Sequence, residues 1–455
     1  MLLLLACAKS PVATQDSADP LPPLPSVWGH RIAEDFDPDP TVVEVRLQAA
    51  QTEHSFGDDP VEVWSYNGEL PGPLIQARVG DRVRVVFDNA LPEDETTIHW
   101  HGLRVPDVQD GIPAIVDPVE PGGTFTYEFL VEDASSFWYH PHVRGYEQIE
   151  RGLYGPLIVH EAETYDIDTE RYFVLDDVLL KDNGKLYGFN LDNNHMWQMH
   201  GRYGNTLLVN GSAELLEDTV RPGGVERWRV VNTASARTMW VDVEGADYRV
   251  IGVDGGLLEE PFSQNRVRVP VGARVDLEVI PHLDATEVTL SVDLPDGTGR
   301  YDSYPMFTAT VEGEAGAGAP IDWIPAEVPA RQEALQEIEI KLNGVAGETN
   351  IEWTINGDTF GDHEPIYASA NTPTLIHITD KSNAEHPFHL HGNFFQILER
   401  NGEPADEPGL RDTVLVEGED ELWLYTELEN PGRWMTHCHI NEHAELGMMT
   451  ELIVE

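Results

Sequence analysis

Cysteine is almost absent from this sequence, since Cys7 and Cys438 are the only two among 455 residues. This scarcity argues against a framework of disulfides. Basic residues are also few: 28 lysines and arginines stand against 81 aspartates and glutamates, for a formal net charge of -53. Such a chain would repel nucleic-acid phosphates, which argues against a nucleic-acid partner and favours a solubilising acidic surface. No apolar run is long enough to cross a bilayer as a helix.

The first ten residues, MLLLLACAKS, place a short apolar run before a Leu-Ala-Cys sequence. This segment resembles the end of a bacterial lipoprotein signal, in which the cysteine becomes the lipidated first residue of the mature chain. We therefore expect residues 1–26 to form a signal and a flexible tether, with a lipid anchor on Cys7. The expected location is the periplasm or the cell surface. Because a basic n-region is missing, an incidental start of a disordered tail is the alternative.

Three Asn-Gly pairs recur along the chain at a nearly constant interval. They begin at Asn67, Asn210 and Asn356, which are 143 and 146 residues apart. Each pair is followed by a segment that alternates and is rich in β-branched residues, a pattern typical of strands joined by tight turns. A recurrence at a fixed interval predicts repeated domains of one fold.

The sequence therefore predicts three consecutive β domains. Their expected bounds are 27–165, 166–325 and 326–455, with a Gly-, Ala- and Pro-rich linker at 313–330 before the third. Helical signals are few, and the clearest covers residues 192–200. The fold class is all-β.

Histidines are grouped in a pattern that points to metal binding. Four His-x-His pairs occur: His99/His101, His140/His142, His389/His391 and His437/His439. On a strand, residues two apart share a face, so each pair can present two imidazoles to one place. The middle domain carries no such pair, which predicts that it acts as a spacer.

The segment HCHINEHAELGM, residues 437–448, adds a softer set of ligands. Its thiol and thioether, Cys438 and Met448, stand with His443, and His386 lies just before another His-x-His pair. Thiolate, imidazole and thioether together suit copper in an electron-transfer site. Zinc competes for such ligands, but its closed tetrahedral sites do not explain a cysteine threaded between two histidines.

These motifs identify the chain as similar to the three-domain multicopper oxidases, the family of laccases and bacterial cuprous oxidases. The resemblance covers nearly all of residues 27–455. It implies three cupredoxin-like Greek-key β-sandwich domains and four copper ions as cofactors, three of them in a trinuclear cluster between the first and third domains. The implied type 1 copper ligands are His386, Cys438, His443 and Met448.

The same resemblance implies the ligands of the cluster. The type 2 copper is held by His99 and His389, and the two type 3 coppers by two sets of three histidines: His101, His140 and His439, and His142, His391 and His437. The implied enzyme oxidises a donor one electron at a time at the type 1 copper and reduces O2 to water at the cluster. Electrons are expected to enter at His443, whose ring edge reaches the substrate surface in the family, and to leave through Cys438.

Reduction of O2 also consumes protons, so a carboxylate is expected near the cluster. Asp110 stands where the family has its acidic residue, although a turn before Gly111 would also explain it. Many bacterial members have a second acid directly after the last type 1 histidine, but here that residue is Ala444. Glu442 or Glu445 is the expected substitute, unless water carries the protons.

The electron donor is the least defined part of the prediction. A phenol or a similar small aromatic donor is the default, and the segment HMWQMH at 195–200 offers a Cu(I) or Fe(II) alternative through its methionines and histidines. Packing at a domain contact would also explain that segment. A cell-envelope protein without activity and a copper nitrite reductase are disfavoured, because all twelve expected ligands and four His-x-His pairs are present.

Overall fold

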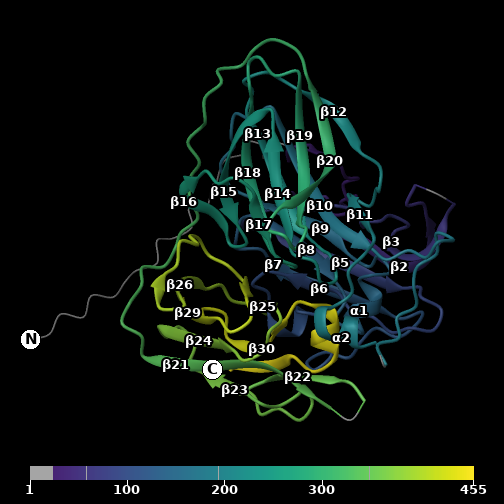
Figure 1. The fold of residues 1–455 in the computed structure, drawn as a ribbon, viewed down its shortest axis with the longest axis vertical. Helices are drawn as coiled ribbons and strands as arrows, with labels where there is room; N and C mark the ends of the chain where they lie inside the picture. Colours follow the sequence, from purple (N-terminus) through teal and green to yellow (C-terminus); the bar gives the residue numbers. More distant parts are fainter. Residues whose placement is uncertain (1–23, 58, 193, 348) are drawn as a thin grey trace, which may run out of the picture.

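The computed structural model describes residues 24–57, 59–192, 194–347 and 349–455. The chain forms six β-sheets that lie in three pairs, with short helices between them. Figure 1 shows the middle pair at the top of the molecule and the other two below it. The all-β prediction is confirmed. Cys7 lies outside the described residues, and within them no helix is long and apolar enough to span a membrane.

The first pair of sheets holds the first two His-x-His pairs. One sheet has the order β3 (Val61–Tyr66), β2 (Val42–His54), β5 (Arg82–Asn89) and β7 (Thr124–Leu130). The other has the order β4 (Ile75–Arg78), β9 (Gly155–His160), β8 (Ser135–His140) and β6 (His99–His101).

The middle pair is the largest. Its first sheet runs β1 (Val27–Trp28), β10 (Thr169–Val178), β13 (Glu226–Asn232), β18 (Arg274–Pro281), β15 (Ala246–Val253) and β16 (Gly256–Phe262), with β11 (Thr206–Val209) paired to β10. Its second sheet runs β12 (Leu216–Val220), β20 (Tyr301–Val311), β19 (Glu287–Pro295), β14 (Met239–Glu244) and β17 (Val267–Val269).

The third pair holds the remaining predicted ligands. One sheet runs β22 (Ile351–Ile355), β21 (Gln336–Ala346), β24 (Thr374–Asp380), β29 (Glu421–Thr426), β26 (Gln396–Arg400) and β27 (Glu403–Pro404). The other runs β23 (Ile366–Ala368), β31 (Met449–Val454), β30 (Gly432–Cys438), β25 (His386–Leu390) and β28 (Thr413–Val416).

The three Asn-Gly pairs occupy the same place in each pair of sheets. Asn67, Asn210 and Asn356 all have positive φ, as does the glycine after each, which is the conformation of a tight hairpin turn. Each asparagine side chain also fastens the turn to a neighbouring strand. Asn67, for example, accepts a hydrogen bond from the backbone of Gln48 and donates one to that of Arg46. The predicted turns are confirmed.

The second strand after each turn, which is the predicted alternating segment, also has equivalent partners. In each pair of sheets, it runs parallel to one strand and antiparallel to another: β5 between β2 and β7, β13 between β10 and β18, and β24 between β21 and β29. Alternate side chains of β5 and β24 are buried, because only one face of each sheet meets the core. Each pair of sheets encloses its own apolar core.

Three short helices lie where the pairs of sheets meet. They are α1 (Gly145–Gln148), α2 (His195–His200) and α3 (Asn441–Glu445), and both α1 and α2 pack against α3. α2 falls within the segment predicted to be helical. A one-turn 3-10 helix, η1 (Asp107–Gln109), ends next to Asp110.

Candidate metal centres

The first candidate centre, the cysteine site, consists of His386, Cys438, His443 and Met448. The Sγ atom of Cys438 lies 3.5 Å from Nδ1 of His386 and 3.7 Å from Nδ1 of His443. The two Nδ1 atoms are 3.2 Å apart, so three potential ligand atoms converge on one point. β25 supplies the first residue, the end of β30 the second and α3 the third.

The cysteine site is closed to solvent. Cys438, His443 and Met448 are fully buried, and the backbone amide of Cys438 donates a hydrogen bond to the carbonyl oxygen of Met448. Burial lowers the pKa of His386 to about 3 and raises the pKa of the Cys438 thiol. Burial thus favours the protonated thiol, whereas a bound cation would favour the thiolate.

The second candidate centre, the histidine cluster, is formed by the four His-x-His pairs. Three sets of imidazoles bring their ligand atoms within 4.8 Å of one another: His99, His101 and His389; His101, His140 and His439; and His142, His391 and His437. β6 and β8 contribute from the first pair of sheets, and β25 and β30 from the third. The cluster therefore exists only where these two pairs of sheets meet.

Strand register explains how each set forms. His99 lies opposite His140 in the β6–β8 ladder, and His389 lies opposite His437 in the β25–β30 ladder. Side chains directly opposite on neighbouring strands are close together. Two local ladders therefore preassemble half of the cluster each, and docking of the two halves completes it.

Hydrogen bonding leaves the metal-facing nitrogens of the cluster free. Nδ1 of His99 and Nδ1 of His389 contact the carbonyl oxygens of Asp110 and Asp412, each at 3.0 Å. The Nε2 atoms of several cluster histidines are buried without any hydrogen-bond partner among the described residues: His99, His140, His142, His389 and His439. Buried polar atoms are rarely left unpaired, and a histidine bound to metal typically donates its other nitrogen to an oxygen. The donor set therefore fits metal ions.

The protonation states of the cluster histidines also fit metal binding. Burial lowers the pKa of His437 to about 3 and that of His140 well below its usual value, and neighbouring imidazoles add to the effect. These two rings are therefore neutral at pH 7. A neutral imidazole is the form that binds a metal ion.

Asp110 lies against the cluster, where the sequence predicts an acid. Its Oδ2 atom accepts a hydrogen bond from Nδ1 of His391 at 2.8 Å, and its Oδ1 atom lies 3.1 Å from Nδ1 of His99. The side chain is fully buried. A single carboxylate from the first pair of sheets thus touches a histidine of each half of the cluster.

Asp412 is a second carboxylate at the cluster, and no sequence pattern predicted it. Its Oδ1 atom lies 3.3 Å from Nε2 of His101 and 3.4 Å from Nδ1 of His389. Arg274, from β18 of the middle pair, donates to both of its carboxylate oxygens at 2.6 Å. Burial opposes ionisation, but the charge of Arg274 holds the pKa of Asp412 well below its usual value.

The middle pair of sheets is therefore more than the predicted spacer. Besides Arg274, it brings Gly272 against the cluster, with φ at +83°. A Cβ atom at that position would lie 2.9 Å from His439 and 3.0 Å from His101. The spacer interpretation is wrong because it considered only residues that could bind metal, and not those that pack around them.

His443 is less accessible to solvent than the family resemblance implies. The ring is fully buried, and its Nε2 atom lies 3.2 Å from the carbonyl oxygen of Met199 on α2. The indole of Trp353 covers one face of the ring, with centroids 4.1 Å apart. The expectation that the ring edge reaches the surface is therefore wrong, since α2 and Trp353 enclose it.

Because residue 444 is an alanine and not an acid, two nearby carboxylates, Glu442 and Glu445, are the candidates for a second proton donor. Glu442 is buried with both carboxylate oxygens unpartnered among the described residues, and burial raises its pKa to about 8. Glu445 is an exposed residue of α3, and desolvation by its neighbours raises its pKa as well. Either assignment stays a prediction.

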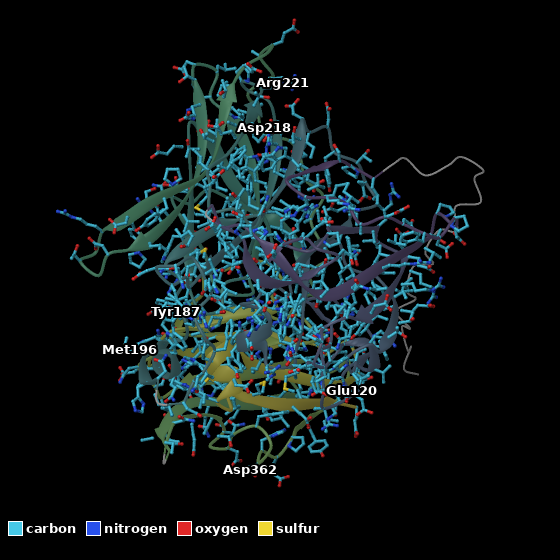
Figure 2. All side chains as sticks on the ribbon, turned by 90° about the vertical axis from the view of Figure 1, so that its right-hand side faces the viewer. Glu120, Tyr187, Met196, Asp218, Arg221 and Asp362 are labelled. Atoms are coloured by element: carbon cyan, nitrogen blue, oxygen red, sulfur yellow. The ribbon has the colours of Figure 1, made fainter. Side chains whose placement is uncertain are left out.

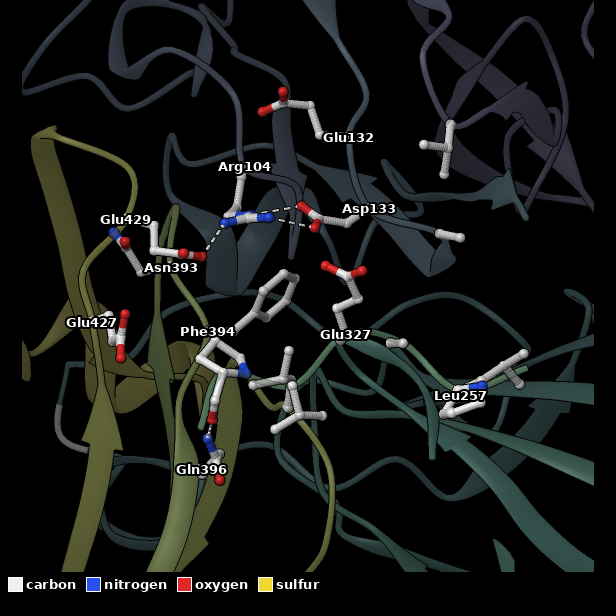
Figure 3. Close-up of a pocket in the computed structure, with 18 of the residues that line it drawn as sticks. Arg104, Glu132, Asp133, Leu257, Glu327, Asn393, Phe394, Gln396, Glu427 and Glu429 are labelled. Carbon is white, nitrogen blue, oxygen red and sulfur yellow. Dashed lines mark hydrogen bonds and ion pairs between the residues drawn. The ribbon is translucent and has the colours of Figure 1, made fainter. Parts of the chain in front are cut away.

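A cavity of about 750 Å³ lies at the junction of the three pairs of sheets, apart from both centres. Figure 3 shows Arg104 in its wall, between Asp133 and Glu429. The guanidinium binds both oxygens of Asp133 at 2.7 and 2.6 Å and one oxygen of Glu429 at 2.8 Å. Since none of the twelve predicted ligands lines this cavity, its contacts join the first and third pairs of sheets rather than serve the metal centres.

Three pairs of β-sheets with a cysteine site and a shared histidine cluster define a copper oxidase, and comparison with known proteins agrees. Family models described as multicopper oxidase match residues 48–164, 170–283 and 331–455. The chain belongs to the multicopper oxidase family. It is an oxidase that couples oxidation of a reducing substrate to reduction of O2.

Individual relatives extend the likeness over almost the whole chain. A multicopper oxidase of Mycobacterium tuberculosis is 28% identical over 99% of this chain and 93% of its own length. Laccase-1 of Botryotinia fuckeliana is 27% identical over 86% of this chain and 78% of its own length. The crystal structure of a multicopper oxidase from Pseudomonas thermotolerans has a TM-score of 0.77 and 28% identity, covering 91% of this chain and 99% of that one. The predicted cupredoxin fold is confirmed.

Proposed function

We propose that this oxidase holds four copper ions in the two centres. The type 1 copper would be held by His386, Cys438, His443 and Met448. The histidine cluster would hold the other three, with His99 and His389 on the type 2 ion and three histidines on each type 3 ion. The observation that supports this most strongly is the division of the eight cluster imidazoles into sets whose free nitrogens converge.

Copper in these centres supplies one-electron redox chemistry and the binding of O2. The protein provides the path between them, because Cys438 is bonded through the backbone to His437 and His439, which belong to opposite sets of the cluster. The carboxylate of Asp110 lies within hydrogen-bond distance of His391, close enough to the cluster to supply protons there. Because the Asp110 side chain is fully buried, bulk water does not reach the cluster past it.

Two classes of electron donor fit this enzyme. A phenol or a similar small aromatic donor is the first, and the likeness to a fungal laccase supports it. Metal ions, Cu(I) or Fe(II), form the second class. The enclosure of His443 under α2 favours them, because a ring-shaped donor has no exposed imidazole edge to contact.

Copper content and colour test the assignment. Purified protein loaded with copper should hold about four ions per chain and be intensely blue, because a thiolate–copper bond gives that colour. Cys438→Ser should remove the blue colour, and Cys7→Ser, the only other cysteine variant that the chain allows, should keep it. A blue Cys438→Ser protein would contradict the type 1 assignment.

Export and lipid anchoring through Cys7 are also proposed, on the sequence of residues 1–10 alone. Metabolic labelling with a fatty acid should mark the wild-type protein in membranes and fail to mark Cys7→Ser. Equal labelling of both proteins would contradict the anchor.

A further inference from the structure

The cavity at the junction of the three pairs of sheets carries an excess of negative charge. Its volume of about 750 Å³ is typical of a small-molecule site. Seven acids line it, against a single basic residue, Arg104. Glu161 is paired with Arg227, which is not itself a lining residue. Four of the acids have no cationic partner among the described residues: Glu132, Glu163, Glu327 and Glu427.

Arg104 shows how this cavity holds an organic cation. Its guanidinium lies between Asp133 and Glu429, and its Cζ atom is 5.8 Å from the centre of the Phe394 ring. Carboxylates and the face of an aromatic ring are the groups that bind organic cations in proteins. Because four more carboxylates line the same cavity without a cation, it can take further groups of this kind from a ligand.

Glu327 belongs to the linker between the middle and third pairs of sheets, and the linker is fixed on both sides of it. The backbone amide of Ala326 donates to the carbonyl oxygen of Leu257, and Nε2 of Gln396 donates to that of Pro329 at 3.0 Å. Figure 3 shows the Glu327 side chain pointing into the cavity. Since the backbone around this unpaired carboxylate is already held, binding would cost little conformational entropy there.

The walls between the acids are largely apolar. Leu257 and Leu428 are buried, whereas Ile324 is 52% exposed and Val79 is 40% exposed, and all four line the cavity. Covering exposed apolar side chains stabilises a complex in proportion to the area removed from water. A ligand that fits this cavity therefore carries apolar stretches between its positive charges.

Acidity alone does not distinguish the cavity, because acids are spread over the molecule. Figure 2 shows Glu120, Asp218 and Asp362 far apart from one another. The cavity differs in that it combines unpaired carboxylates with an aromatic face and exposed apolar walls. A hard ion such as Mg²⁺ or Ca²⁺ binds through oxygen ligands and would leave those walls uncovered.

We propose that this cavity binds a linear polyamine. Its ammonium groups would pair with carboxylates such as Glu132 and Glu327, and its methylene groups would cover the apolar walls. The lining residues come from all three pairs of sheets and from the linker, so the ligand would hold these parts together. None of the predicted copper ligands lines the cavity, so the colour and the turnover of the enzyme do not depend on this site.

The test uses the copper-loaded protein, spermidine as the polyamine, and the double variant Glu132→Gln with Glu327→Gln. The matched control, Glu120→Gln with Asp362→Asn, also removes two exposed carboxylates without a side-chain partner in the described part of the chain, but outside the cavity. Calorimetry at about 0.15 M salt measures binding, because this ionic strength screens the general attraction of a polyamine to an acidic surface. Mg²⁺ is the second probe, since it has charge but no methylene groups.

The wild type and the matched control should bind one spermidine, and the double variant should bind it at least tenfold more weakly. Spermidine at about 100 times its Kd should raise the unfolding temperature of the first two proteins and raise that of the double variant less. The blue colour and the turnover of a phenol should be the same in all three.

Three results would overturn the inference. Equal affinity for spermidine in all three proteins would show that the acidic surface as a whole attracts it. Binding that does not saturate would show that no defined site exists. Mg²⁺ binding as tight as that of spermidine, and lost in the same double variant, would show that the cavity takes any cation and that its apolar walls play no part.

Discussion

Arg274 binds Asp412 through two parallel hydrogen bonds of 2.6 Å across the boundary between the middle and third pairs of sheets. Both side chains are almost fully buried. Asp412 in turn lies beside His101 and His389 of the histidine cluster. The middle pair of sheets contains no predicted metal ligand, yet through Arg274 and Asp412 it orients two ligands of the cluster, His101 and His389.

Replacing Arg274 by Met should remove this support. It leaves the charge of Asp412 buried and unpaired, which costs about 3–5 kcal/mol in the free energy of unfolding. We also expect copper to be lost from the cluster while the blue type 1 centre persists. Unfolding in denaturant, copper analysis and electron paramagnetic resonance would measure these effects.

A double variant, Arg274→Met with Asp412→Asn, separates stability from orientation. It removes both charges, so most of the unfolding free energy should return, whereas the cluster signal should stay altered. Recovery of a normal cluster signal would show that Arg274 only balances charge.

Gly272→Ala should disturb the cluster by crowding. The added Cβ would press on His439 and His101 at 2.9 and 3.0 Å, and φ of +83° disfavours alanine in any case. We expect fewer than three coppers in the cluster and slower reduction of O2. Gly68→Ala, at another positive φ but with nothing within 4 Å, is the control for backbone strain alone. Equal losses in both variants would rule out crowding.

Asp110→Asn should slow turnover with every donor by about 100-fold, the lower range for loss of a general acid. The blue colour should remain, because Asp110 contacts the cluster and not the cysteine site. Asp110→Glu should restore part of the rate, since it keeps a carboxyl group. Asp107→Asn, a nearby residue on η1, should behave as wild type. Full activity in Asp110→Asn would exclude the proton role.

Trp353→Phe should open the path to His443. Phenylalanine keeps an aromatic ring over the histidine but cannot donate to the carbonyl oxygen of Gln198, a bond worth about 1 kcal/mol. The α2 helix should therefore loosen, and kcat/KM for a phenol should rise several-fold. Steady-state kinetics would measure the change, and an unaltered or lower value would show that α2 does not limit access.

His160 allows a test of how stability depends on pH. Burial lowers its pKa from 6.5 to about 4, so that the unfolded chain binds a proton more readily than the folded protein between those values. The stability that this residue contributes is complete above pH 6.5 and is lost as the pH falls towards 4. At pH 4.5 the loss is about 2.5 kcal/mol, at about 1.4 kcal/mol per pKa unit.

His160→Gln keeps a polar partner for Gln76, which lies 2.7 Å from the imidazole, but cannot become charged. The variant should therefore lose less unfolding free energy than the wild type between pH 8 and 4.5, by about that amount. Parallel curves for the two proteins would contradict the buried neutral state of His160.

The sequence carried more information about the ligands than about what surrounds them. The His-x-His pairs and the Asn-Gly turns obey local rules of strand and turn geometry, so that a short stretch is enough to recognise each. Arg274 and Asp412 are 138 residues apart, and no local pattern marks either one. The cover over His443 comes from Met199, 244 residues away, which is why its burial could not be foreseen. The helix itself was predictable because its residues are neighbours.

The histidine cluster is divided between two distant parts of the chain, with ligands from His99 to His142 and from His389 to His439. During synthesis the first half must therefore wait for its partner until nearly the whole polypeptide has been made. A stalled or truncated chain can hold neither the complete cluster nor the cysteine site. These centres can therefore bind copper only after the last strands of the chain have been synthesised. A protein that holds copper in both centres is one whose synthesis has been completed.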